Sequence, residues 1–306
     1  MINIYHRAIK QAELRKIDNF QVGSWIEVFD PGEEEIKKIV KMLKVEEDLL
    51  IDALDPFEVP RLEQEAGVTY VFTQVPEKRE NEIITFPLLI VIGKNFVLTV
   101  SKEKFSFLDS IKGLAGNIYT TQKTKFFLQI FSSINYQYNN FLIEINKGLR
   151  GIKIRLEKVG NKDIVQFVDF ERILNDFISA LVPTNSVLQK LLSGKHIAMF
   201  EEDKDLVEDL FLDNGQLIEM SKSTLKHVVN IRDAYSNIMT HSLNRIVKIL
   251  TALTIILTVP TMIFSFFGMN VNLPYASSGF SYLIILGFTL FTSLFIFIIF
   301  ARNRWL

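Results

Sequence analysis

Residues 249–301 read ILTALTIILTVPTMIFSFFGMNVNLPYASSGFSYLIILGFTLFTSLFIFIIFA, and they include no Asp, Glu, Lys, Arg or His. A helix needs about 20 mostly apolar residues to cross a bilayer, so this stretch fits two spans joined by a short loop. We expect the spans at about 246–267 and 280–301. The alternative is a buried helical hairpin in a soluble protein. It would need a very large core, because the second segment is apolar on every face.

Basic residues flank the two expected spans. Arg245 and Lys248 precede the first span and Arg302 and Arg304 follow the second, whereas the connecting loop has no basic residue. Because basic residues collect on the cytoplasmic side of a membrane, both termini are expected in the cytoplasm. The sequence thus predicts a multi-pass protein of the cell membrane.

Composition narrows the possible functions. The chain has 306 residues, a formal net charge of −1 and no cysteine. So small a net charge gives no general attraction to nucleic acid, and no nucleic-acid partner is expected. The closest two histidines, His227 and His241, lie about 21 Å apart on one expected helix and cannot share a metal ion. No catalytic arrangement is recognisable, and we expect the protein not to be an enzyme.

Residues 1–120 mix strand and helix patterns. Residues 33–44 carry apolar side chains at helical spacing, and Gly93-Lys94-Asn95 is typical of a hairpin turn. Short stretches rich in β-branched and aromatic residues predict strands. These are WIEVF at 25–29, VTYVFTQV at 68–75, IITFPLLIVI at 83–92 and FVLTV at 96–100. This region is expected to form a cytosolic α/β domain.

Three long helical stretches follow, at about 121–159, 163–193 and 203–266. The last would be about 95 Å long at 1.5 Å per residue, which is too long for a compact domain. We therefore expect long cytosolic helices and a stalk that continues into the first span, which makes the chain an α+β membrane protein. The expected regions are 1–120, 121–245, the first span at 246–267, the external loop at 268–279, the second span at 280–301 and a basic tail at 302–306.

A polar stripe runs along the last of these helices. At alternating steps of three and four residues, twelve of thirteen positions are polar. The period of 3.5 residues is that of supercoiling helices. The positions are Ser223, Lys226, Asn230, Asp233, Asn237, Thr240, Asn244, Val247, Thr251, Thr254, Thr258, Thr261 and Ser265. Because the stripe continues into the span, it favours identical helices around a water-filled axis. The alternative is that the hydroxyls bond backbone carbonyls or hold neighbouring helices together.

Gly268-Met269-Asn270 lies between the first expected span and the short loop, and the chain ends Arg304-Trp305-Leu306. With two C-terminal spans and a large N-terminal region, this arrangement resembles the CorA family of Mg²⁺ channels over the full length of the chain. The resemblance implies a homopentamer in which the first span lines the pore. It also implies that Gly268, Met269 and Asn270 form the selectivity filter.

Further positions acquire roles from the resemblance. Asp233 and Asn244 match polar positions on the cytosolic side of the pore, and Leu250 matches a residue of the hydrophobic gate. The pore-lining set is then Asp233, Asn244, Leu250, Thr251, Thr254, Thr258, Thr261 and Ser265. Two departures stand out. Thr258 lies where some members have methionine, and residues 271–279 lack the acidic residue that many members carry there.

In the N-terminal half, Asp52-Ala53-Leu54 and the VPRLE of residues 59–63 resemble a family signature near the subunit interface. Asp52 matches one regulatory Mg²⁺-sensing aspartate, and Asp209 matches its partner from the adjacent subunit. The match is partial, because Ile51 replaces an acidic neighbour. The alternative for Asp209 is an ordinary solvated surface charge.

The resemblance implies that Mg²⁺ is both the transported and the regulatory ion, with no other cofactor. The expected partners are membrane lipid, further copies of the chain, and Mg²⁺ together with other divalent cations. Two alternatives stay open at this point. One is a transporter of Zn²⁺, Co²⁺ or Ni²⁺ in the same family, and the other is a membrane-anchored cytosolic scaffold or sensor without transport.

Overall fold

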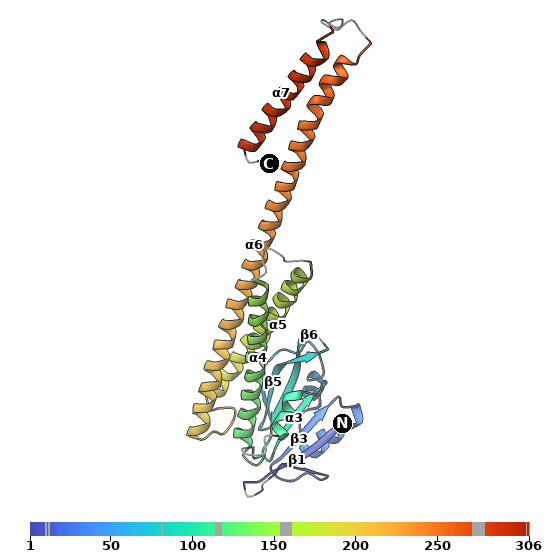
Figure 1. Cartoon of the computed structure of the whole chain (residues 1–306). Helices are drawn as coiled ribbons and strands as arrows, with labels where there is room; N and C mark the ends of the chain where they lie inside the picture. Colours follow the sequence, from blue (N-terminus) through green and yellow to red (C-terminus); the bar gives the residue numbers. More distant parts are fainter. Residues whose placement is uncertain are drawn as a thin grey trace. The chain divides into compact units, whose positions relative to one another are not determined.

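The computed structural model describes residues 1–306 apart from 10, 12, 81, 114–117, 154–160, 271–278, 304 and 306. It forms two compact units, Met1–Ile231 and Arg232–Leu306. The strands are β1 (Ile2–His6), β2 (Arg15–Ile17), β3 (Ser24–Phe29), β4 (Leu62–Glu65), β5 (Val68–Arg79), β6 (Glu82–Ile92) and β7 (Phe96–Ser101) (Figure 1). The helices are α1 (Glu33–Leu43), α2 (Glu47–Asp52), α3 (Ser106–Gly113), α4 (Lys123–Lys153), α5 (Asn161–Leu192), α6 (Glu201–Phe267) and α7 (Ser281–Arg302).

The first unit contains a seven-stranded mixed sheet. Its strand order is β2-β1-β3-β7-β6-β5-β4. Only β3 and β7 pair in parallel, and all other neighbours are antiparallel. The four predicted strands are confirmed as β3, β5, β6 and β7. The predicted turn at Gly93 joins β6 to β7, and the Gly93 amide donates to the Phe96 carbonyl oxygen at 3.1 Å.

The sequence pattern did not identify β1, β2 and β4. The last two are the edge strands of the sheet, and they consist of the short polar sequences RKI and LEQE. Short, charged strands are common at sheet edges because they discourage pairing with other chains. The same polarity removes the alternation of apolar and polar residues by which a strand is predicted.

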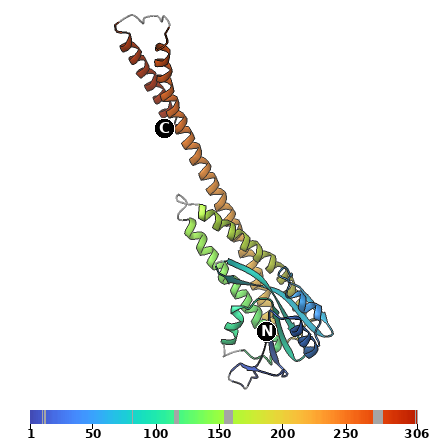
Figure 2. The ribbon, with the colours of Figure 1, turned by 90° about the vertical axis from the view of Figure 1, so that its right-hand side faces the viewer.

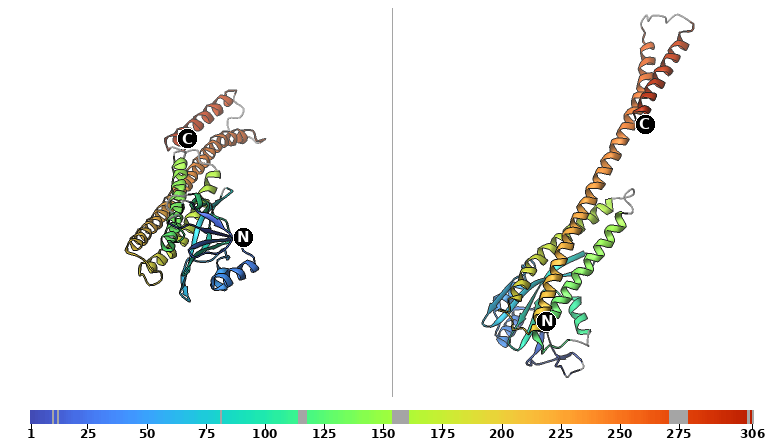
Figure 3. Two further views of the ribbon diagram at one scale, coloured as in Figure 1. Left: turned by 90° about the horizontal axis from the view of Figure 1, so that it is seen from below. Right: turned by 90° about the vertical axis from the view of Figure 1, so that its left-hand side faces the viewer.

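The sheet separates two hydrophobic cores, because successive side chains of a strand point to opposite faces. On β6, Leu89 and Val91 pack in the core that includes residues of α1 and α2. Leu88 and Ile90 pack in the core that includes residues of α4, α5 and the first part of α6. Figure 3 shows α1 on one side of the sheet and the long helices on the other, and Figure 2 shows the same unit from the side.

Side-chain hydrogen bonds fix the long helices on the sheet and on one another. The Tyr138 hydroxyl of α4 donates to the Gln74 carbonyl oxygen of β5 at 3.0 Å. The Asn135 amide of α4 donates to the Leu210 carbonyl oxygen of α6 at 3.4 Å. The three predicted helical stretches are confirmed as α4, α5 and α6, although residues 154–159 of the first stretch, and residue 160 after it, lie outside the described residues.

The second unit consists of the C-terminal part of α6 together with α7. Both helices are long and apolar enough to cross a membrane, with mean hydropathy of 2.1 and 2.7 over their most apolar windows. The observed ends, Phe267 for α6 and Arg302 for α7, lie within one residue of the predicted ends of the spans. The two apolar helices predicted from the uncharged stretch are therefore present.

Candidate ion path and cation-binding residues

One face of α6 in the second unit is directed toward α7. Its least exposed positions include Ala252, Ile256, Val259 and Ile263, which recur every three or four residues. Helix α7 runs beside this part of α6, and its buried residue is Thr289 (Figure 1). These positions form the side of α6 that α7 covers.

The hydroxyl stripe lies on the opposite face of α6. Thr251, Thr254, Thr258, Thr261 and Ser265 are all exposed. At about 100° per residue, their mean direction is roughly 150° from that of the positions facing α7. The stripe therefore points away from the second apolar helix of its own chain. If further copies of the chain surround a common axis, this face is free to line it.

The stripe hydroxyls in the middle of the span bond to their own helix. Thr254, Thr258 and Thr261 donate to the carbonyl oxygens of the residues four positions earlier, at 2.8, 2.7 and 2.9 Å. Such bonds between hydroxyls and backbone carbonyls are the alternative explanation of the stripe, but they do not exclude a pore. A hydroxyl that has donated its proton still has acceptor capacity on oxygen. The exposed face of α6 thus presents acceptors, which suit the outward-pointing hydrogens of a hydrated cation.

The orientation of the stripe can be tested by chemical labelling. Cysteines replacing Thr254, Thr258 and Thr261 should react more readily with small water-soluble thiol reagents than cysteines replacing Ile256 and Ile263, which face α7. The reason is that water reaches only the pore-lining face of a membrane helix. The rates would be measured with the full-length protein in liposomes. Equal labelling of the two sets would rule out a wet pore along this face.

The Gly268-Met269-Asn270 segment directly follows the end of α6. The Gly268 amide donates to the Phe264 carbonyl oxygen at 2.9 Å, and the Met269 amide donates to the Phe266 carbonyl oxygen at 3.4 Å. A Cβ atom on Gly268 would lie 3.3 Å from the Phe264 carbonyl oxygen, which leaves little room for a side chain. Met269 and Asn270 are exposed. The loop predicted to follow, apart from Gly279, lies outside the described residues.

The remaining candidate pore residues also lie on exposed positions of α6. Asn244 and Leu250 are exposed, and the Asp233 carboxylate lies 3.5 Å from the Arg232 guanidinium. Their common placement on one helix agrees with a single path along α6. Their roles in ion passage stay predictions, because a single chain does not enclose a pore.

The two candidate sensor aspartates lie on opposite sides of the sheet. Asp52 is the last residue of α2, whose side chains pack in one core, and Asp209 is exposed on α6, whose side chains pack in the other. Asp209 also lines a cavity of about 330 Å³ between α4 and α6, together with Lys125 and Asp213. One chain therefore cannot bring the two carboxylates to a shared ion, and a shared site requires two chains.

The carboxylates fit a Mg²⁺ ion that keeps most of its water. No group of three or more His, Cys, Asp or Glu residues that could hold a metal ion occurs among the described residues. Mg²⁺ is usually bound through one or two carboxylates while water fills its other positions. The side chain of Asp52 is 44% exposed and Asp209 is exposed, so both can reach a hydrated ion.

Asp52 has a partner that the sequence reasoning missed. Its Oδ2 accepts a hydrogen bond from Arg61 Nη2 at 2.7 Å. Arg61 also pairs with Glu58 and Glu63, and its guanidinium stacks over the Phe72 ring, 4.0 Å from the centroid. The sequence did contain one indication of this cluster, because Glu58 and Glu63 lie close to Arg61 along the chain.

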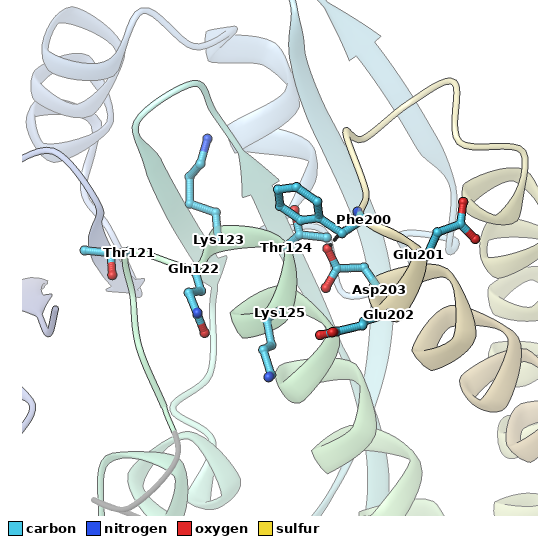
Figure 4. Close-up of a pocket in the computed structure, with 9 residues that line it drawn as sticks. All are labelled: Thr121, Gln122, Lys123, Thr124, Lys125, Phe200, Glu201, Glu202 and Asp203. Carbon is cyan, nitrogen blue, oxygen red and sulfur yellow. Dashed lines mark hydrogen bonds between the residues drawn. The ribbon is translucent and has the colours of Figure 1, made fainter. Parts of the chain in front are cut away.

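Another cavity of the first unit lies where α4 and α6 begin (Figure 4). Its volume is about 540 Å³. The Lys123 ammonium donates to the carbonyl oxygens of Gly93 and Lys94, and burial lowers the pKa of Lys123. An Asp203 carboxylate oxygen accepts from the Phe200 amide at 3.1 Å. These groups hold a hairpin and a helix start in place, and we assign this cavity no part in ion binding.

Comparisons with known proteins relate the whole chain to one family of transporters. The family described as "CorA-like Mg2+ transporter protein" matches residues 20–302. The cobalt/magnesium transport protein CorA of Methanocaldococcus jannaschii is 26% identical over 294 residues, covering 92% of this chain and 91% of that protein. The magnesium transport protein CorA of Campylobacter jejuni is 26% identical over 246 residues, covering 75% of this chain and 71% of that protein.

Solved structures show the same fold. The complete structure of the CorA magnesium transporter from Methanocaldococcus jannaschii has a TM-score of 0.87 and 24% sequence identity, and the match covers 100% of this chain and 99% of that one. The full-length CmaX protein has a TM-score of 0.75 and 16% identity, with 99% of this chain and 97% of that chain covered. The chain therefore belongs to the CorA-like family of Mg²⁺ transporter proteins, and it is an α+β membrane protein of this family of divalent-cation transporters.

Proposed function

We propose that this chain forms a homopentameric Mg²⁺ channel of the cell membrane, with five copies of α6 around a central axis and both termini in the cytoplasm. The observation that carries the proposal is the position of the stripe. The hydroxyls of α6 are exposed on the face opposite α7, so an assembly with α7 outside places them around the axis. A membrane anchor without transport would not need this face to be polar.

Selection of the ion would occur at the end of α6. Mg²⁺ loses its water reluctantly, so an efficient filter binds the hydrated ion rather than the bare one. A ring of five Asn270 side chains offers five carbonyl oxygens that can accept hydrogen bonds from coordinated water. Because the ring carries no fixed charge, it does not hold the ion too tightly for release. Gly268 allows the close approach of the Phe264 carbonyl oxygen, from which a Cβ atom would lie only 3.3 Å away. Met269 joins this glycine to Asn270 in the proposed filter.

Below the filter, the stripe gives the hydrated ion a continuous set of acceptors from Ser265 to Thr251. Leu250 would form an apolar constriction at which the path closes, and Asn244 and Asp233 would receive the ion on the cytosolic side. A negative-inside potential drives this movement by about 2.3 kcal/mol per elementary charge for each 100 mV.

Cytosolic Mg²⁺ would close the channel through Asp52 and Asp209. An ion held between Asp52 of one subunit and Asp209 of the next binds the closed assembly better than the open one. Such differential binding shifts the population toward the closed state. The exposed carboxylates on opposite sides of the sheet support a site shared by two chains.

Purified protein in sealed liposomes that contain a Mg²⁺ indicator tests the transport activity. We expect Mg²⁺ to enter these liposomes and not protein-free ones, because the proposal needs no other protein. Adding Co²⁺, Ni²⁺ or Zn²⁺ outside, with matching indicators inside, determines which divalent ions share the path. If Zn²⁺ enters and Mg²⁺ does not, the transported ion is Zn²⁺ and the proposal of a Mg²⁺ channel is wrong. Entry of no divalent ion would leave the scaffold as the better explanation.

A further inference from the structure

Arg61 lies at the centre of a compact charged cluster beside the proposed sensor. Each side-chain nitrogen of its guanidinium contacts a different carboxylate: Nη2 contacts Asp52, Nη1 contacts Glu58 and Nε contacts Glu63. The stack over Phe72, which is itself buried on β5, fixes the plane of the guanidinium. One arginine thus neutralises part of the charge of three carboxylates.

The three carboxylates are not equally free to leave Arg61. Glu58 is the least exposed, with 13% of its side chain exposed, and its backbone oxygen accepts from the Gln74 amide at 2.9 Å. Asp52 is the most exposed, with 44%, and it lies at the end of a helix of only six residues. Asp52 can therefore release Arg61 while Glu58, Glu63 and the Phe72 ring keep the guanidinium in position.

We propose that Arg61 competes with Mg²⁺ for the Asp52 carboxylate and so sets the Mg²⁺ concentration at which the sensor fills. This inference rests on the proposed role of Asp52 in sensing. A cation that binds Asp52 must displace a charge-assisted hydrogen bond and approach a fixed positive charge. Both effects raise the concentration that is needed. Because Asp52 and Arg61 are partly exposed, the pair is weak enough for Mg²⁺ to displace it.

The competition predicts that the sensor becomes more sensitive when Arg61 loses its charge. In the full-length protein, Arg61→Gln should lower the midpoint Mg²⁺ concentration for protection from protease by about three- to tenfold, as expected for removing one charge near a divalent ion in water. Titration calorimetry with Mg²⁺ should show the same shift. Arg172→Gln is the matched control, because Arg172 also pairs with two carboxylates, Glu82 and Asp176, and its variant should keep the wild-type midpoint.

A purely structural role for Arg61 predicts the opposite outcome. The Arg61→Gln midpoint would then stay unchanged or rise, as a loosened domain protects itself less well, and either result overturns the competition. If Arg61→Gln does not assemble, Arg61→Met provides the same test, because its side chain still packs on Phe72 but carries no charge. The expected shift is again downward.

Asp52→Asn separates this inference from the proposed sensor. Adding Arg61→Gln to Asp52→Asn should produce no further shift, because the group for which Arg61 competes is gone. If Asp52→Asn itself leaves the wild-type midpoint unchanged, both the sensor and the competition are wrong. If Asp52→Asn removes the response but Arg61→Gln has no effect, only the competition is wrong.

Discussion

Asn270→Ala is expected to abolish nearly all Mg²⁺ flux while the protein still folds, assembles and inserts. The substitution removes five hydrogen-bond acceptors from the ring that would bind the hydrated ion. With no acidic residue at 271–279, the sequence offers no charged substitute in that loop. Flux would be measured in liposomes and divided by the amount of assembled pentamer. Asn303→Ala is the matched control, because Asn303 lies just beyond the C-terminal end of α7, as Asn270 lies just beyond that of α6. The Asn303→Ala variant should conduct Mg²⁺ normally.

Asn270→Asp should act through charge rather than through loss of acceptors. Up to five carboxylates at the filter would bind divalent ions more tightly and slow their release, so the variant should conduct poorly or with altered selectivity. If Asn270 serves only to cap the helix, the alanine variant would lose roughly 1 kcal/mol of stability and keep its flux. Wild-type flux per assembled channel in Asn270→Ala would therefore contradict the filter assignment.

The second large effect is expected from replacing both Asp52 and Asp209 with asparagine. The double variant should lose the protection from protease that millimolar Mg²⁺ gives the parent, and its channel should stay active at high internal Mg²⁺. Each occupied site stabilises the assembly that binds the ion by about 1.4 kcal/mol at ten times the dissociation constant. Five such sites make the closed state strongly dependent on Mg²⁺, so losing them should have a large effect.

The control for this experiment is Asp48→Asn with Asp205→Asn. These residues lie on the same two helices, α2 and α6, and are also exposed, so the change in charge is identical. The control should retain protection by Mg²⁺. Equal protection of the Asp52 and Asp209 double variant and its parent would place the sensor elsewhere in the molecule.

The spans and the central strands could be predicted because their signals are local. A stretch without charge defines the two apolar helices, and alternating or continuous apolar residues define β3, β5, β6 and β7. The period of the polar stripe is equally local. The sequence could not show which face of α6 meets α7, because α7 is apolar on all sides and no face of it is marked for packing. The structure supplies that orientation.

The charged cluster around Arg61 could not be predicted for a different reason. Its contacts join the end of α2, the following loop and the first residues of β4 over the Phe72 ring, so they depend on how the chain folds back onto the sheet. The resemblance to a family identified Asp52 as a sensor candidate but gave no information about its partner in this chain. The roles of the individual site residues stay predictions that the experiments above would test.

The most direct test of the account is Mg²⁺ entry into liposomes under an imposed membrane potential. For an ion with two charges, 100 mV negative inside favours entry by about 4.6 kcal/mol. If α6 lines a passive path, purified wild-type protein should admit Mg²⁺ at a rate that rises steeply with the inside-negative potential, without any proton or sodium gradient. A rate of Mg²⁺ entry no higher than in protein-free liposomes, or a rate that does not change with the membrane potential, would contradict a channel.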